Sequence, residues 1–297
     1  MPPADPGAAG AGRRGSTKNP AVTIVGIDCA AAAERTGFAV AHFEGGLLTV
    51  KECWVGKKGD AAGAQVERLV PVLQEARSTL LALDSPLGWP AALGPHLAVH
   101  QAGRPIRAEA DALFRRLTDK VVRERIGKNP LEVAADRIAR TARAALLVIG
   151  ALEERLQVRI DLAWSPVIGE GVKAIEAYPA GTLRSYLLAR GHGRADGTST
   201  DRAKGLGGSG AGFSDKKGLL RFLARRGALR MNVRSDLADH RLDAVMCAVA
   251  ARDFLLGESI TPSELQMEAA RKEGWIWVRD PGCGPARPGV GTASNRA

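Results

Sequence analysis

The sequence lacks paired cysteines, long apolar runs and internal repeats. No C-x-x-C pair occurs among its four cysteines, which argues against a zinc knuckle and against a disulfide scaffold. No stretch approaches the roughly 20 apolar residues that a membrane-spanning helix needs. No apolar segment follows Arg13 and Arg14, as it would in a secretory signal. We therefore expect a soluble, cytoplasmic protein that does not associate with a membrane.

Acidic residues are outnumbered by basic ones. The 297 residues include 42 Lys and Arg against 32 Asp and Glu, which gives a net charge of +10. This excess is concentrated between positions 184 and 234, where 12 basic residues face 3 acidic ones. Because a positive surface attracts anions, nucleic acid is one candidate partner among several.

The central part of the chain is predicted to fold as one domain, residues 21–280. Residues 1–20 and 281–297 are rich in Pro, Gly and Ala and include basic residues. We expect both to be disordered tails, because they cannot bury enough apolar surface to become ordered. With 45% hydrophobic residues overall, the chain is long enough to bury a substantial core.

Five segments are predicted to form the strands of one mixed sheet in an α/β fold, flanked by helices. The first three strands are AVTIVGIDCA, RTGFAVAHFEGG and LLTVKECWV, and Gly45-Gly46 between the last two indicates a hairpin. A helix follows over about residues 61–78, which Pro71 should bend. The fourth strand lies in TLLALDSPLGWP, and the fifth in GVKAIEAYPAG. Helical periodicity between them predicts a helical insertion over residues 91–165.

Acidic residues stand at or near the ends of three of these strands: Asp28, Asp84 and Glu176. In open α/β sheets, ligands bind at the carboxyl ends of the strands, which makes the three positions candidates for a site. The alternative is that each Asp caps the turn that follows it. Glu176 has a further structural alternative, an ion pair with a nearby arginine.

A fourth acid lies on the apolar helix DHRLDAVMCAVAARDFLLG, residues 239–257. Spacing at 100° per residue places Arg241 and Arg252 on a solvent-facing stripe and Asp243 nearly opposite, toward the core. A buried carboxylate is usually paired or bound to a metal, so Asp243 either ligates a cation or pairs with an arginine. Asp239 has an ordinary explanation as a capping residue, with Asp236 as the N-cap. His240 is either a partly exposed polar residue or part of the site.

Several acids that converge on one site repel each other unless a cation lies between them. Mg²⁺ or Mn²⁺ prefers such oxygen ligands, and two ions can hold the attacking and leaving oxygens of a phosphodiester. The pattern therefore predicts metal-dependent phosphodiester hydrolysis, with bound phosphates contacted by basic residues: Arg115, Arg116, Lys216 and Lys217. For Arg115, Arg116 and Asp119, a salt-bridged surface is the alternative. Trp275 and Trp277 are expected to pack rather than to stack on bases.

The strand-end GIDCA, the following TGFAVA and the β-β-β-α-β order resemble the RNase H-like fold. Further motifs resemble the family called domain of unknown function 429, which groups predicted nucleases of that fold: ALDSPLGWP, FRRLTD, IEAYPAG, DHRLDAVMCAVAARDFLLG and EGWIWV. These motifs run in order from Ile24 to Val278 and are specific as a set. The resemblance implies a five-stranded RNase H-like nuclease domain.

The last helix also resembles that of RuvC-type Holliday junction resolvases, in which a His or Asp is followed after two residues by Asp-Ala. This second resemblance implies that Asp28 bridges metal ions, that Asp84 and Asp243 are further metal ligands, and that His240 ligates metal or handles a proton. The helical insertion after Asp84 departs from the resolvases, which leaves their substrate geometry open.

These observations favour a Mg²⁺- or Mn²⁺-dependent nuclease acting on DNA or RNA, whose catalytic set is Asp28, Asp84, Asp243, Glu176 and His240. One alternative is an ATP-using enzyme of the related actin and sugar-kinase fold, because GIDCA followed by Thr-Gly also resembles a phosphate-binding hairpin. Another is an inactive nucleic-acid or protein binder on the same scaffold. Assembly as a homodimer is left open.

Overall fold

The computed structural model describes residues 21–59, 63–134, 136–191, 213–233, 237 and 239–284. Three antiparallel strands begin the sheet: β1 (Val22–Asp28), β2 (Gly37–Glu44) and β3 (Leu47–Val55). Gly45 and Gly46 connect β2 to β3 with φ values of 56° and 88°. Two consecutive positive φ values are typical of a hairpin turn that only small or flexible residues adopt easily, so the predicted hairpin is confirmed.

The remaining strands extend the sheet on both sides. Helix α1 (Ala64–Glu75) contains Pro71 and leads into β4 (Ser78–Leu83), which pairs parallel to β1. β6 (Gly171–Glu176) pairs parallel to β4. Two short strands lie at the edges, β5 (Asp161–Leu162) and β7 (Leu229–Met231). The order is β5-β6-β4-β1-β2-β3-β7, so the described residues form a seven-stranded sheet rather than the predicted five. Strands of two or three residues are too short to show an alternating pattern.

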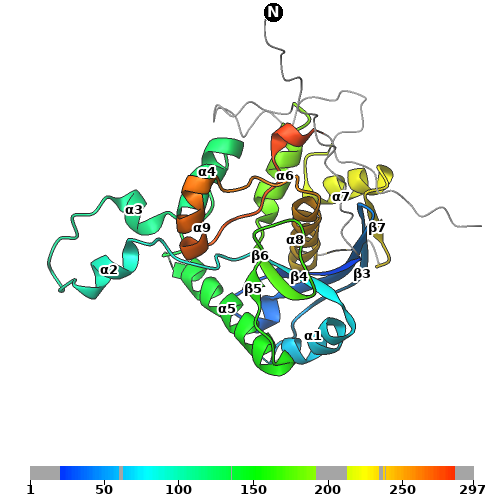
Figure 1. The fold of residues 1–297 in the computed structure, drawn as a ribbon, viewed down its shortest axis with the longest axis horizontal. Coiled ribbons are helices and arrows are strands. Elements are labelled where there is room, and N and C mark those ends of the chain that lie inside the picture. The colour runs from blue at the N-terminus through cyan, green and yellow to red at the C-terminus, as the bar shows by residue number, and fades with distance from the viewer. Residues whose placement is uncertain are drawn as a thin grey trace, which may run out of the picture.

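The predicted helical insertion is present between β4 and β6, apart from β5 near its end. It consists of four helices: α2 (Leu93–Ala98), α3 (Ala110–Phe114), α4 (Leu117–Ile126) and α5 (Asp136–Leu156). Figure 1 shows that α2 and α3 project from the rest of the molecule, whereas α4 and α5 pack against it. The insertion therefore contributes both to the core and to an extended arm.

Helices cover both faces of the sheet (Figure 1). Helices α1 and α5 pack on one face, against Val25 and Ile27 of β1. On the other face α8 (Asp239–Leu255) packs against β1 to β4, where it meets Val22 and Ile24. The elements that flank α8 on that side are α6 (Pro179–Leu188), α7 (Lys216–Arg225) and α9 (Met267–Glu273). Because β1 is buried on both faces, its polar end residue faces the protein interior.

The helix that carries Asp243 is itself central, and this corrects one prediction. Every residue of α8 from Ala244 to Leu255 is buried. Arg252, expected on a solvent-facing stripe, is 0% exposed, bonds the Gly46 carbonyl and pairs with Asp253. The prediction from 100° spacing was wrong for Arg252, because this part of α8 is covered on all sides and has no solvent-facing stripe. The Arg252 side chain therefore bonds groups inside the protein.

The tails lie almost entirely outside the described residues. Residues 1–20 and 285–297 are not described, nor is Asp236, the expected N-cap of α8. The first residues of the predicted C-terminal tail are described and form a short 3-10 helix, η3 (Pro281–Cys283). The Gly284 carbonyl accepts a hydrogen bond from Arg279 at 2.9 Å. The folded part therefore extends a few residues beyond the predicted boundary.

Candidate active site

Asp28 and Asp84 are neighbours at the carboxyl edge of the sheet. In the parallel pair β1–β4, Ile27 lies opposite Leu83, so the next residue of each strand is an aspartate. The backbone N–H of Asp84 donates to the Ile27 carbonyl at 2.8 Å, which continues the ladder into this pair. Side chains alternate along a strand. Because Gly26 faces α8, Asp28 faces α8 as well.

Two glycines allow the first turns of α8 to lie directly on the sheet. A Cβ atom on Gly26 would stand 2.0 Å from the Ala244 carbonyl oxygen, and one on Gly37 would stand 2.2 Å from that of His240. Real side chains cannot approach a backbone so closely. The glycines therefore bring His240 and Asp243 to the end of β1. Sequence reasoning did not single them out, although glycine within a strand is a known signal of close backbone approach.

Asp28 on β1 and Asp243 on α8 each have a basic partner. His240 Nδ1 lies 2.6 Å from Asp28 Oδ2, with the imidazole 43% exposed and the carboxylate 12% exposed. Lys216, the first residue of α7, forms an ion pair with Asp243. Both members of that pair are partly exposed. Solvent and small ligands can therefore reach the cluster from the α7 and α8 side.

The three aspartates form one electrostatic unit. The pKa of Asp28 is raised to about 6, because burial and the charge of Asp243 outweigh the opposing contributions of His240 and Lys216. Burial also raises the pKa of Asp84 well above its usual value, with added contributions from Asp28 and Asp243. Perturbed carboxylates at a strand edge are typical of functional sites. Negative charge at this edge exceeds the compensation that Lys216 and His240 provide.

This donor set fits a hard divalent cation better than a thiophilic one. Cys29 and Cys247 lie beside the aspartates, and both thiols contact the Ile27 carbonyl. Burial and the charges of Asp84 and Asp28 raise the pKa of both thiols. They are therefore neutral thiols rather than thiolate ligands.

The cation would not be held by the protein alone. In the described ranges, no three His, Cys, Asp or Glu side chains are arranged to hold a metal ion. Mg²⁺ characteristically takes only one or two carboxylates and completes its shell with water and substrate oxygens. Asp28 and Asp84, with Asp243 nearby, fit that requirement by their chemistry.

Glu176 contributes to the raised pKa of Asp84, but its side chain is engaged elsewhere. It lies in register with Leu83, one position before Asp84, so its side chain leaves the sheet on the opposite face from Asp84. There it accepts two hydrogen bonds from Arg116, each of 2.7 Å. The structure thus places Glu176 in the arginine pairing that was its structural alternative, rather than among the predicted catalytic acids.

The basic residues predicted to bind substrate differ in accessibility. Arg116 is 1% exposed and pairs with both Glu176 and Asp119, so it does not present its guanidinium to a phosphate in solution. Arg115 pairs with Asp111 and Glu132. Both arginines follow the ion-paired alternative, although Arg116 is buried rather than on a solvent-facing surface.

Helix α7 retains the predicted basic character. Lys217 is exposed, and its neighbour Lys216 faces the acids. Residues 192–212 and 234, which belong to the basic segment noted in the sequence, lie outside the described residues. Among the four predicted phosphate-binding residues, Lys216 lies beside Asp243, and Lys217 is exposed one residue further along α7.

The two tryptophans near the C-terminal end are core residues, as expected. Trp275 and Trp277 are 2% and 3% exposed. The indole N–H of Trp275 donates to the Ile260 carbonyl at 3.0 Å, and Trp277 packs edge-on against Phe254. Packing explains both rings fully.

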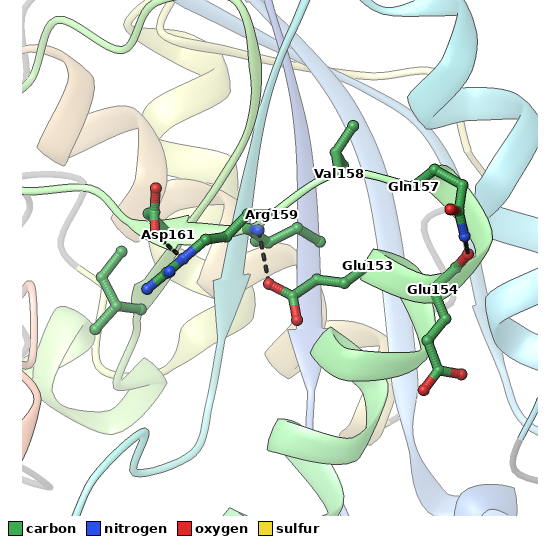
Figure 2. A pocket seen from close by; sticks show the side chains of 8 residues that line it. Glu153, Glu154, Gln157, Val158, Arg159 and Asp161 are labelled. Atoms are coloured by element: carbon green, nitrogen blue, oxygen red, sulfur yellow. Dashed lines mark hydrogen bonds and ion pairs between the residues drawn. The ribbon is translucent and has the colours of Figure 1, made fainter.

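A separate hollow between α5 and β5 carries none of the predicted site residues. Its volume is about 780 Å³, and Figure 2 shows the charged and polar side chains that line it. Arg159 donates to Asp161 at 2.7 Å, and Glu153 accepts from the backbone N–H of Ile160. Because these charges already have partners, the aspartates at the carboxyl edge of the sheet remain the candidate site.

The fold and this cluster define an α/β protein whose mixed sheet carries three coupled aspartates at its carboxyl edge. The family model described as "Protein of unknown function (DUF429)" matches residues 26–266, and the chain belongs to this family. The search of curated proteins found no match. No helix within the described residues is both long and apolar enough to cross a membrane.

Proposed function

We propose that this protein is a metal-dependent nuclease that hydrolyses phosphodiester bonds in DNA or RNA. One observation carries the proposal: Asp28 and Asp84, which follow paired positions of β1 and β4, lie together with Asp243 of α8 at the carboxyl edge of the sheet. Burial raises the pKa of Asp84, and the charges of Asp28 and Asp243 raise it further. A site with surplus carboxylate charge and basic surroundings suits a divalent cation and an anionic substrate. The antiparallel β1–β3 followed by α1 and the parallel β4 supports the proposed RNase H-like fold.

The proposed cofactor is Mg²⁺ or Mn²⁺, held by Asp28 and Asp84 with Asp243 beside them. When bound, such an ion would activate water for attack and neutralise charge on the phosphate. Asp84 is the most informative of these proposed ligands to replace. Within the described residues, no basic side chain is paired with it as His240 is with Asp28 and Lys216 with Asp243.

His240 is suited to moving a proton. Asp28 engages its Nδ1 atom, which orients the ring and leaves Nε2 as the nitrogen free of that contact. A carboxylate-oriented, partly exposed imidazole can accept a proton from attacking water or give one to a leaving oxygen. The same contact leaves Nε2 available for either role expected for His240, proton handling or metal ligation.

The lysines of α7 would bind the substrate backbone. Lys216 already neutralises Asp243, and a phosphate at the site would offer its ammonium group a second anionic partner. Lys217 is exposed one residue further along. Contacts of this kind fix the position of a nucleic acid without reading its sequence.

The proposal is tested by a cleavage panel over single-stranded, duplex and branched DNA and RNA with Mg²⁺, Mn²⁺ or EDTA. We expect metal-dependent cleavage that falls by at least about 100-fold in Asp84→Asn. Asp161→Asn is the matched control, because Asp161 is a surface acid paired with Lys173 and Arg159. Cleavage that persists in Asp84→Asn would exclude this site. Calorimetric Mn²⁺ binding without turnover on any substrate would favour an inactive binder, and ATP binding would favour the kinase-like alternative.

A further inference from the structure

We propose that Arg116, Glu176 and Glu273 form a clamp that positions the loop carrying Asp84. This loop, residues 84–91, follows β4 directly. Its Leu87 N–H donates to Glu176 Oε2 at 3.2 Å, and its Ala91 N–H donates to Glu273 Oε1 at 2.8 Å. Two carboxylates from β6 and α9 thus hold two backbone amides of a loop to which neither belongs.

Arg116 connects the two carboxylates. Its guanidinium donates two hydrogen bonds of 2.7 Å to Glu176, and Nη1 also lies 3.3 Å from the Glu273 backbone carbonyl. The adjacent Leu117 N–H donates to Glu273 Oε2 at 2.7 Å. Asp119 holds the other side of the guanidinium. The start of α4 therefore fixes both acids that grip the loop.

The clamp restrains Asp84 because only two residues separate Asp84 from Leu87, which Glu176 holds. Asp84 is fixed on one side by its N–H bond to Ile27, and Leu87 is fixed three residues later by Glu176. The loop also lies tightly on α9, since a Cβ atom on Gly88 would stand 2.6 Å from the Glu273 carbonyl oxygen. A backbone held at both ends and along its length has little freedom to move the Asp84 carboxylate.

Stability alone does not account for this arrangement. Buried ion pairs are often no more stabilising than apolar residues of the same volume, because charged groups lose hydration on burial. Here the carboxylate oxygens also satisfy loop amides that would otherwise be buried without partners. The clamp residues therefore act through Asp84 as positioning residues and do not take part in the chemistry. Their catalytic consequence rests on the proposed function, whereas their hold on the loop does not.

The structure provides a matched control in a second buried arginine. Arg279 is 0% exposed and pairs with Asp253 and Glu258, just as Arg116 is 1% exposed and pairs with Glu176 and Asp119. Within the described part of the chain, the Arg279 guanidinium bonds Asp253, Glu258 and the Gly284 carbonyl, none of which belongs to the 84–91 loop. Arg116→Lys and Arg279→Lys should destabilise the protein alike and differ in their effect on the loop.

The test measures amide hydrogen exchange by NMR in the metal-free protein, at denaturant concentrations that equalise global stability. In Arg116→Lys we expect the Leu87 and Ala91 amides to exchange at least about tenfold faster than in the wild type. Without the clamp, these amides exchange through local opening of the loop rather than through a larger unfolding. In Arg279→Lys their exchange should be unchanged. Unchanged exchange in Arg116→Lys, or equal acceleration in both variants, would overturn the clamp. If Arg116→Lys does not fold, Glu273→Gln serves as the second variant.

A kinetic measurement tests the consequence for the site. On a substrate that the wild type cleaves, Arg116→Lys should lower kcat by about tenfold or more and leave KM within about twofold, because positioning affects the transition state rather than binding. Arg279→Lys should change neither value. If Arg116→Lys retained wild-type kcat, the positioning role would be wrong. A wild type that cleaves nothing would instead refute the proposed function, and the exchange experiment would still decide whether the clamp exists.

Discussion

The two ends of helix α8 carry charge in opposite ways. At the C-terminal end, Arg252 and Asp253 are both 0% exposed, and Asp253 also accepts from Tyr186 at 2.8 Å and pairs with Arg279 at 3.3 Å. At the N-terminal end, His240 and Asp243 are partly exposed, and each has one partner on another element. The same helix thus contains an enclosed ion network and an accessible one.

The difference lies in charge balance and access. The buried network sets Arg252 and Arg279 against Asp253 and Glu258, so its two positive and two negative charges balance. The accessible cluster sets three aspartates against one lysine and one histidine, and the charge of Asp243 raises the pKa of both Asp28 and Asp84. A balanced, enclosed network serves the fold. An unbalanced, accessible cluster has excess negative charge, which a bound cation would neutralise while it also binds an anionic substrate.

The largest effect on stability should come from displacing the N-terminal end of α8 from the sheet. Gly26→Ala places a methyl group 2.0 Å from the Ala244 carbonyl oxygen, so the helix must move off β1. We expect a loss of about 5 kcal/mol in the free energy of unfolding, measured by urea denaturation. Gly150→Ala is the control, because nothing lies within 4 Å of its new methyl group in α5. This variant should gain about 0.5–1 kcal/mol. Equal stability of the two variants would contradict the close approach.

The next effect separates the two networks directly. Asp253→Asn should cost about 4 kcal/mol, because it leaves buried guanidinium groups without their charged partner. Asp243→Asn should cost less than about 1 kcal/mol, because water can solvate Lys216 once its partner is neutral. Chemical denaturation of both variants at neutral pH provides the comparison. A larger loss for Asp243→Asn would reverse the assignment of the two ends.

A smaller effect should appear in the pH dependence of stability. The folded pKa of Asp28, about 6, exceeds its usual value of 3.8, so the folded state binds more protons between these values. Stability therefore falls as the pH rises from about 4 to 6. Asp28→Asn lacks this contribution, so its stability relative to the wild type should increase by about 2 kcal/mol across that window. Thermal unfolding in EDTA measures it. A relative stability that stays constant or decreases would show that Asp28 is not destabilised by burial.

The smallest effect concerns the exposed lysine of α7. Lys217→Ala should change stability by less than about 0.5 kcal/mol. It should also weaken nucleic-acid binding uniformly across sequences and reduce the slope of log K against log salt by about one. Arg77→Ala removes the same charge before β4, at the opposite edge of the sheet from Asp84. This control should leave the slope unchanged, and equal slopes for both variants would place the nucleic acid elsewhere.

Much of the fold followed from local patterns. Short apolar segments bounded by turn signals located β1 to β4 and β6, and Gly45-Gly46 located the hairpin. The patterns missed β5 and β7, which exist only because longer neighbouring strands pair with them. They also misjudged Arg252, because periodicity shows which face of a helix is polar but not whether another layer covers that face.

The sequence indicated which elements carry acids at or near their ends, but not which of these acids lie together. Asp28, Asp84 and Glu176 were indistinguishable in the sequence, since all three stand at or near strand ends. Glu176 separates from the others only through the register of β6 on β4, which aligns it with Leu83 instead of Asp84. The clamp residue Glu273 gave no signal, because its role depends on a loop about 180 positions away in the chain.

By itself the sequence determined where strands and helices form and which of them end in an acid, because these properties depend on side chains close together in the chain. Only the tertiary structure decided which acids meet. Pairing of β1 with β4 set Asp28 beside Asp84, and two glycines brought α8 onto the sheet with Asp243. A shift of one residue in register moves a side chain to the other face of a sheet. Charges so placed act on one another over a few ångströms, whatever their separation in the sequence.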